Sequence, residues 1–331
     1  GLVGSEMCIR DRSEFVADEG RSSLPYLQEL TLRLAIGASQ LDPSIRQLHA
    51  KWLVAQQRAD GGFAGREGES DPYYTAFALR ALWILESLDE SIGARAAAFL
   101  RQRMTERESI IDLISLIFGA AICEMAVGAV VIDDDDQSWR ENVARLLSSL
   151  RTSDGGFAKS PEGRAGSTYQ TFLAVLCHEL IEIDVPDAES VEAFLDSQHH
   201  PDGGYLEIRA AKRPGVNPTA AAIGTLKTLG RLDARSHRDT AEFLAEMQSD
   251  EGGLTANTRI PFADLLSSFT GLLTLQDLQA AELVKVDQIG NYARSMQAAG
   301  GGFVGFALDN TPDVEYTFYG LATLALCESM R

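Results

Sequence analysis

Three aspartates hold positions from which a carboxyl group could exchange a proton with a ligand. Asp71, Asp264 and Asp313 each follow a glycine-rich turn and directly precede a long apolar stretch. A carboxyl group in apolar surroundings has a raised pKa, which suits it to act as an acid or a base. An aspartate in front of a helix can instead be a plain N-cap, because its side chain accepts a hydrogen bond from the first turn. The three aspartates are therefore candidate catalytic residues with a structural alternative.

Basic residues collect in the same parts of a chain that is otherwise strongly acidic. The formal net charge is −19 at pH 7. The segments behind the glycine turns nevertheless carry Arg66, Arg164, Arg209, Lys212, Arg213 and Arg259. Helix N-termini favour anions, so these cations predict a pocket for a diphosphate or carboxylate head group, and all except Arg164 are candidate substrate-binding residues. The alternative is ion pairing with nearby acids such as Glu67, Glu69 and Glu162.

The sequence predicts neither a metal site nor a cofactor. Cys123, Cys177 and Cys327 are isolated within apolar stretches, and His199 and His200 are adjacent, so neither residue type has the spacing of metal ligands. No nucleophile elbow, phosphate-binding glycine loop or dinucleotide fingerprint is present. The net charge also argues against binding of nucleic acid, which needs clustered Lys and Arg.

Recurring glycine turns organise these residues. The first glycines stand at positions 61, 155, 203, 252 and 301, and in all but one copy an aromatic residue follows two positions later. The last three intervals are 48, 49 and 49 residues, and the first is 94, or twice 47, which predicts a sixth, degenerate copy near residue 108. A fixed period of this length indicates a repeat architecture. Because only glycine visits positive φ cheaply, each pair indicates a corner between two helices.

Two kinds of helix alternate around these corners. Helices that are apolar on most sides are expected to begin near Asp71, Ser109, Ser167, Pro218, Asp264 and Asp313, with an extra one near Leu24. Amphipathic helices are expected over residues 44–57, 92–103, 137–150, 188–198, 235–248 and 283–297. The apolar helices belong inside and the amphipathic ones outside. We therefore predict an all-α fold, an α/α toroid of six helical hairpins, and favour ring closure over an open solenoid.

The repeat resembles that of a known family. The segment Gln57-Arg58-Ala59-Asp60-Gly61-Gly62-Phe63, followed by a helix that contains Tyr74-Thr75, is similar to the repeat of protein prenyltransferase β subunits and of squalene and terpenoid cyclases. The resemblance covers nearly the whole chain and implies inner and outer rings of helices around a cavity that holds an isoprenoid. It also implies that each acid at an inner helix start faces this cavity together with the residue three positions later. The resulting pairs are Asp71 with Tyr74, Asp264 with Ser267, and Asp313 with Tyr316, and they add Tyr74 and Tyr316 to the candidate binding residues.

The residues that carry the family's two chemistries are not all present. The resemblance puts the prenyltransferase zinc ligands at Asp264, Leu266 and Tyr316, but that site needs a thiolate and an imidazole at the last two positions. The family's Asp-x-Asp-Asp-Thr acid motif is closest to residues 71–75, which contain one acid. The acidic run at 133–136 precedes an outer helix, and we interpret it as a solvated loop. Neither standard zinc-dependent prenylation nor standard cyclase chemistry is supported.

Two functions from different classes stay open. The first is an isoprenoid-handling enzyme, a transferase or cyclase that acts on a prenyl diphosphate or polyprene without the zinc triad or the acid motif. The alternative is a non-catalytic toroid that binds a lipid or a protein partner. A third interpretation, a barrel acting on carbohydrate, needs two carboxylates across the cavity, about 5–10 Å apart.

Further expectations concern the limits of the domain and its location. Residues 1–12 resemble a translated sequencing adapter, so we expect a disordered artefact of the gene model, followed by one toroid domain over residues 13–331. No stretch of about eighteen apolar residues is free of charge, so no transmembrane segment is expected. Isolated cysteines favour a cytoplasmic location.

Overall fold

The computed structural model describes residues 24–104, 110–132 and 138–331. Within these ranges the regular structure is helical, with isolated β-bridges and no strand, so the all-α prediction is confirmed. Three expectations concern residues outside these ranges: the gene-model artefact at residues 1–12, the sixth, degenerate glycine turn near residue 108, and the acidic loop at residues 133–136.

Inner and outer helices alternate along the chain. The inner helices are α3 (Pro72–Ile84), α5 (Ile110–Val127), α7 (Thr168–Leu180), α9 (Val216–Thr228), α11 (Leu265–Asp277) and α13 (Val314–Ser329). The outer helices are α2 (Pro43–Ala55), α4 (Glu90–Arg103), α6 (Ser138–Ser149), α8 (Ala188–Gln198), α10 (Arg238–Glu246) and α12 (Val286–Ser295). Short 3-10 helices, η1 (Ala234–His237) and η2 (Ala281–Leu283), precede α10 and α12. The inner helices all begin within two residues of the positions predicted from the sequence.

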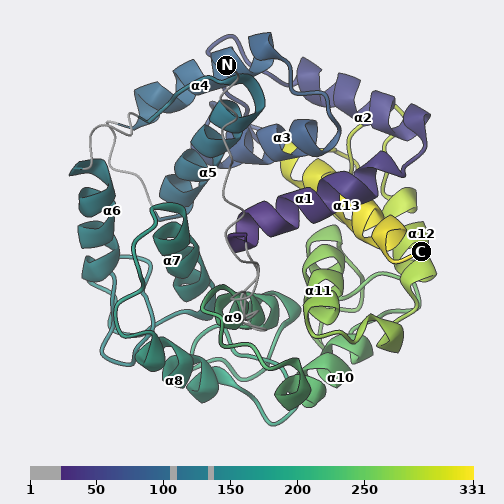
Figure 1. The fold of residues 1–331 in the computed structure, drawn as a ribbon. Helices are drawn as coiled ribbons and strands as arrows, with labels where there is room; N and C mark the ends of the chain where they lie inside the picture. The colour runs from purple at the N-terminus through teal and green to yellow at the C-terminus, as the bar shows by residue number, and fades with distance from the viewer. Residues whose placement is uncertain (1–23, 105–109, 133–137) are drawn as a thin grey trace, which may run out of the picture.

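The inner helices form a closed ring, which the outer helices surround (Figure 1). α3 packs against α5, α5 against α7, and the contacts continue through α9 and α11 to α13, which returns to α3. The last turn is tied to α2 across the closure. The backbone N–H of Gly302 donates to Nδ1 of His49 at 3.0 Å, and the His49 ring lies 4.4 Å from that of Phe303 between centroids. The toroid prediction is therefore confirmed.

A repeated set of hydrogen bonds fixes each corner. The backbone N–H of Phe63 donates to Oγ1 of Thr75, in the first turns of the following inner helix, at 3.0 Å. Four later corners repeat this bond, with donors Phe157, Tyr205, Leu254 and Phe303 and acceptors Thr171, Thr219, Ser268 and Thr317. The amide of Gln57 donates to the carbonyl oxygens of Gly61 and Ile92, at 2.8 and 3.0 Å. The turn residues thus hold the ring together.

The first glycine of each described turn is required by both conformation and space. Its φ lies between +91° and +97° at Gly61, Gly155, Gly203, Gly252 and Gly301. A Cβ atom at Gly203 would also lie 2.3 Å from the carbonyl oxygen of Asp239 on α10. Each corner therefore rests directly on the backbone of a neighbouring outer helix, which a side chain at this position would prevent.

An additional helix, α1 (Tyr26–Ser39), crosses one end of the ring. It packs against α13 and α3, and the backbone N–H of Tyr26 donates to Oε1 of Glu179 at 2.8 Å. Arg33 of α1 pairs with Asp277 at 3.1 Å, and Glu29 pairs with Lys227 at 3.1 Å. Glu179, Asp277 and Lys227 stand at the C-terminal ends of α7, α11 and α9. We call this end the floor, and the opposite end, where the inner helices begin, the mouth.

One of the described helices, α5, is long and apolar enough to cross a membrane by length and composition alone. It packs between α3 and α7 as a member of the inner ring. In this protein, 56% of its apolar window is buried inside the fold, as expected for a core helix.

Candidate functional site

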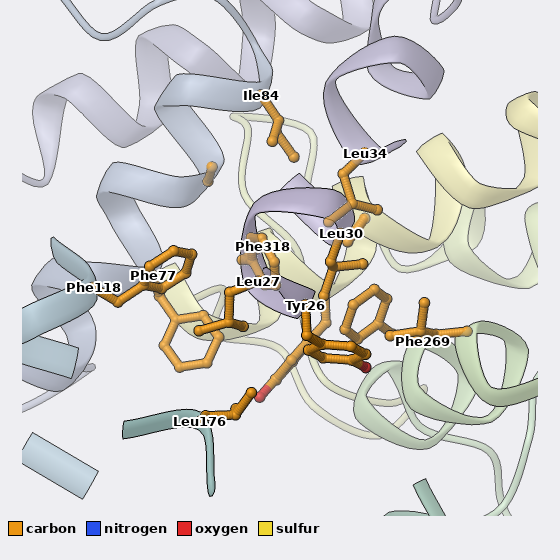
Figure 2. Packing of buried hydrophobic residues seen from close by; sticks show 14 of the residues in the cluster. Tyr26, Leu27, Leu30, Leu34, Phe77, Ile84, Phe118, Leu176, Phe269 and Phe318 are labelled. Carbon is orange, nitrogen blue, oxygen red and sulfur yellow. The ribbon is translucent and has the colours of Figure 1, made fainter. Parts of the chain in front are cut away.

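A cavity of about 460 Å³ occupies the middle of the ring. Its wall is built by α1 and all six inner helices, and most of it is apolar or aromatic. The rings in the wall are Tyr26, Tyr73, Phe77, Phe118, Tyr169, Phe172, Phe269 and Tyr319. Figure 2 shows Tyr26, Leu27 and Leu30 of α1 packed among phenylalanines of the surrounding helices. A cavity of this size and lining suits a small hydrocarbon-rich molecule.

Glu315 brings a carboxyl group to this wall. It stands in the first turn of α13 and accepts a hydrogen bond from the hydroxyl of Tyr73 at 2.6 Å, and Tyr319 forms a second bond with the same carboxyl. Burial raises the pKa of Glu315, although the bonds from the two phenols act in the opposite direction. The carboxyl therefore keeps its proton closer to neutral pH than an exposed glutamate does, and it can donate that proton to a ligand in the cavity.

Glu207 is a second carboxyl group in the wall, but its oxygens hold a helix end. Oγ of Ser167, the N-cap of α7, donates a short hydrogen bond to Glu207, and the backbone N–H of Tyr169 donates to the same carboxyl at 3.4 Å. Burial raises the pKa of Glu207, and these two bonds oppose the rise. We interpret Glu207 as a tie between its loop and the start of α7.

Arg80 of α3 contributes a guanidinium group to the wall. Its central carbon lies 4.0 Å from the ring centroid of Phe318, 5.2 Å from that of Phe118 and 5.6 Å from that of Phe77. Burial lowers the pKa of Arg80 to about 10, so the group remains charged at neutral pH. A positive charge therefore lies among aromatic rings inside the cavity.

The three predicted aspartates all cap inner helices. Oδ1 of Asp71 accepts from the N–H of Tyr74 at 2.8 Å, Oδ1 of Asp264 from that of Ser267 at 2.7 Å, and Oδ1 of Asp313 from that of Tyr316 at 2.8 Å. Burial raises the pKa of each carboxyl. The described wall of the cavity includes none of the three. The N-cap alternative is confirmed, and a role in proton transfer stays a prediction.

The tyrosines paired with these aspartates lie at the mouth. The ring of Tyr74 meets that of Tyr73 edge-on, with centroids 5.2 Å apart, and Tyr316 meets Tyr319 at 6.3 Å. Leu266, at the position that the resemblance gives to a zinc ligand, lines the cavity. The described ranges contain no group of three His, Cys, Asp or Glu residues that could hold a metal ion.

Arg66 joins the first repeat to the last. Its Nε donates to Asp313 and its Nη1 to Asp309, both at 3.0 Å. Its central carbon lies 5.9 Å from the ring centroid of Tyr316. The side chains of Asp309 and Asp313 are 8% and 9% exposed, whereas that of Arg66 is 35% exposed. Arg66 is thus engaged by two nearly buried acids, which compete with any anionic ligand.

Replacing Arg66 with alanine should destabilise the ring closure. We expect a loss of about 1–2 kcal/mol in the free energy of unfolding, because two nearly buried carboxylates lose their counter-ion while water screens the exposed side of the pair. Chemical denaturation of Arg66→Ala measures this loss. Arg209→Ala, which removes an exposed arginine, is the control and should stay within about 0.5 kcal/mol of the wild type. An equal effect of the two variants would contradict the assignment.

The other predicted cations are exposed near the mouth. Arg209, Lys212 and Arg213 lie in the loop before α9, and Arg259 lies in the loop before α11. Nη1 of Arg213 donates to Oγ1 of Thr258 at 3.0 Å, which brings the two loops together. In the part of the chain that the structure describes, none of the four forms an ion pair, so the expected pairing with neighbouring acids is not seen for them. They stay candidates for contact with an anionic head group.

Sequence reasoning missed Glu315, Glu207 and Arg80 as wall residues. A signal existed for Arg80, because it is a charged residue inside the otherwise apolar stretch that forms α3. Glu315 gave no separate signal, because Asp313, two positions earlier, is also a carboxylic acid and stands at the recurring helix-start position. Only the ring geometry shows which of these two carboxyl groups meets the cavity.

Comparisons with known proteins agree with this architecture. Residues 11–182 and 171–331 each match the family described as the prenyltransferase alpha-alpha toroid domain. No curated protein sequence matches the chain.

Several solved structures share the fold at low sequence identity. A variant of the type II terpene cyclase MstE from Scytonema, in complex with geranylgeranyl dihydroxybenzoate, superposes with a TM-score of 0.59 at 12% identity, covering 91% of this chain and 99% of its own. Candida albicans protein geranylgeranyltransferase-I complexed with GGPP superposes with a TM-score of 0.50 at 16% identity, covering 90% of this chain and 84% of its own. An inactive variant of an alpha-1,6-mannanase of Salegentibacter, in complex with alpha-1,6-mannotriose, superposes with a TM-score of 0.56 at 13% identity, covering 91% of this chain and 98% of its own.

Proposed function

The chain belongs to the prenyltransferase alpha-alpha toroid family, and from this premise we propose that its central cavity binds an isoprenoid chain and that Glu315 protonates it. The observation that carries the proposal is a carboxyl group with a raised pKa in the wall of an aromatic, apolar cavity. Two proteins of similar fold hold geranylgeranyl compounds, which is consistent with such a ligand.

The chemistry of the wall favours a cyclase-type reaction over prenyl transfer. Leu266 offers hydrocarbon and Tyr316 a phenol where the resemblance expects two of the zinc ligands of a transferase. Protonation of an alkene instead needs an acid, a dry hydrocarbon pocket and rings that stabilise a carbocation. Glu315, the apolar wall and the rings of Phe77, Phe269 and Tyr319 meet these three needs.

In the proposed reaction, the hydroxyl proton of the Glu315 carboxyl forms a new C–H bond with a terminal alkene carbon. Glu315 becomes a carboxylate, which Tyr73 and Tyr319 stabilise by hydrogen bonds. The positive charge moves to the substrate, where an internal alkene captures it and closes a ring. The resulting cation then loses a proton to water and forms an alkene, and Glu315 takes up a proton from solvent, which restores the acid.

Deuterium labelling tests both parts of the proposal. Incubation with geranylgeraniol, geranylgeranoic acid and geranylgeranyl diphosphate in D₂O should yield, from at least one of them, a cyclised product that carries one additional deuterium at the protonated carbon, as measured by mass spectrometry. Thermal stability should rise with ligand, by about 2.7 kcal/mol at a hundredfold excess over Kd. Stabilisation without product would leave the non-catalytic, lipid-binding toroid, and the absence of both would reject the isoprenoid assignment.

The remaining interpretations receive less support. A sugar substrate requires polar contacts across the cavity, and the wall around Glu207 and Glu315 consists mostly of hydrocarbon and aromatic rings. The candidate acids Asp71, Asp264 and Asp313 and the cations near the mouth stay predictions, as do a protein partner and a cytoplasmic location.

A further inference from the structure

Arg80 lies inside the cavity without an acidic partner. Across residues 24–104, 110–132 and 138–331 it forms no ion pair and donates no hydrogen bond, and its guanidinium packs against phenylalanine rings. After burial itself, the groups that act most on the pKa of Arg80 are the phenols of Tyr319, Tyr26 and Tyr73, which are neutral at pH 7. Arg80 is half-buried, and a guanidinium that is partly withdrawn from water normally has a counter-ion, because its desolvation is costly.

The acids of the floor have other partners: Glu179 accepts the backbone N–H of Tyr26 at 2.8 Å, and the other two pair with cations. Asp277 pairs with Lys227 at 2.8 Å and with Arg33 at 3.1 Å, and Glu29 pairs with the same two cations. The phenyl rings around Arg80 offset only part of the cost of its burial. The cavity therefore presents a positive charge whose counter-ion is not supplied by the described protein.

We propose that Arg80 anchors the anionic end of an isoprenoid ligand and that this end is a carboxylate. The planar fork of a guanidinium matches the two oxygens of a carboxylate, and one positive charge balances one negative charge. A diphosphate carries more charge, whereas Arg80 is the only Arg or Lys among the described residues of the wall. Tyr26 also lines the cavity, and its hydroxyl is a further donor.

The positions of Arg80 and Glu315 give the ligand a direction. Tyr73, which holds Glu315, precedes Arg80 by seven residues on α3, or about 10 Å along the helix axis. α1 closes the floor beyond Arg80, so the ligand enters carboxylate first and leaves its hydrocarbon end near Glu315 at the mouth. The bound carboxylate also neutralises a guanidinium that would otherwise repel a carbocation in the same cavity.

This inference rests on the proposed function and names its substrate class, which is isoprenoid carboxylic acids. Three probes with the same hydrocarbon chain test it, namely geranylgeraniol, geranylgeranoic acid and geranylgeranyl diphosphate, with binding measured by calorimetry at pH 7.5. The wild type should bind the acid about 10- to 100-fold more tightly than the alcohol. Arg80→Met should remove this preference and leave alcohol binding within about threefold. Arg238→Met, on the exposed side of α10, is the control and should behave as the wild type.

The outcomes separate the two proposals. If the wild type binds the alcohol but does not prefer the acid, this inference fails and the isoprenoid cavity stands. If Arg80→Met loses affinity for the alcohol and for the acid to the same extent, Arg80 only packs the cavity. If the wild type prefers the diphosphate and this preference depends on Arg80, the ligand's anionic end is not a carboxylate. If none of the probes binds, the proposed function fails and this inference fails with it. Should Arg80→Met not fold, Arg80→Lys replaces it and should retain a weakened preference for the acid.

Discussion

Replacing Glu315 with glutamine is expected to lower the rate of product formation by about 10²- to 10⁴-fold. Glutamine keeps the size of the side chain and can still accept the hydrogen bond from Tyr73, but its amide offers no acidic proton. Ligand affinity should change by less than about threefold, because the apolar wall is unaltered. The measurement is deuterium incorporation per unit time, with binding determined in parallel.

Two further variants decide whether Glu315 acts alone. Glu207→Gln alters the other carboxyl group of the wall and should reduce thermal stability more than the rate, because Glu207 ties its loop to α7. Glu282→Gln changes an exposed residue of η2 and should alter neither quantity. Full loss of turnover in Glu207→Gln with normal turnover in Glu315→Gln would exchange the roles of the two residues.

The pH dependence of the reaction carries the same test. The proposed acid must be protonated, so the rate should be highest below the pKa of Glu315 and fall as the pH rises through it. Because burial raises this pKa above the ordinary value of about 4.3, activity should persist to a higher pH than an exposed glutamate allows. A rate that increases with pH over this range would instead indicate a base.

Replacing Gly203 with alanine should give the largest loss of stability among the substitutions considered. We expect a decrease of about 2–5 kcal/mol in the free energy of unfolding. Part of it comes from φ near +93° and part from a Cβ atom placed 2.3 Å from the carbonyl oxygen of Asp239. The thermal midpoint should fall by about 4–10 °C.

Two other glycines separate these contributions. Gly68 has φ of +94°, and no atom lies within 4 Å of the point that a Cβ atom would occupy, so Gly68→Ala should show the conformational cost of about 1–2 kcal/mol alone. Gly300 has open space and no positive φ, so Gly300→Ala should be nearly neutral. Equal effects of Gly203→Ala and Gly68→Ala would show that the contact with α10 is easily relieved.

The fold could be predicted from the sequence because its determinants are local and repeated. The glycine that needs positive φ, the aspartate that caps the next helix and the alternation of apolar and amphipathic stretches are all visible within one repeat. The extra helix near Leu24 was also predicted, but its position across the floor was not. That position depends on contacts from Tyr26 and Arg33 to Glu179 and Asp277, which are distant in the sequence.

The residues of the candidate site were harder to predict from the sequence, because they do not recur from repeat to repeat. Asp71 and Asp313 attract attention because they recur at helix starts, yet recurrence reflects their common capping role. Glu315 and Arg80 each occur in one repeat, and their importance depends on which side of a helix faces the cavity. Arg66 was predicted to bind a head group, and its pairing with Asp309 and Asp313 follows from ring closure, which brings the first and last repeats together.

The closed ring also determines how this protein can unfold. In an open solenoid, terminal repeats fray first because each has one neighbour. Here α13 packs against α3 and closes the ring. The described corners also contact an adjoining outer helix, as the turn at Gly203 contacts α10. Each repeat therefore has a neighbour on both sides. Opening any hairpin therefore breaks two interfaces and exposes the cavity to water. The same closure that surrounds the central cavity should make unfolding of the ring cooperative, with hydrogen-exchange protection spread evenly around it.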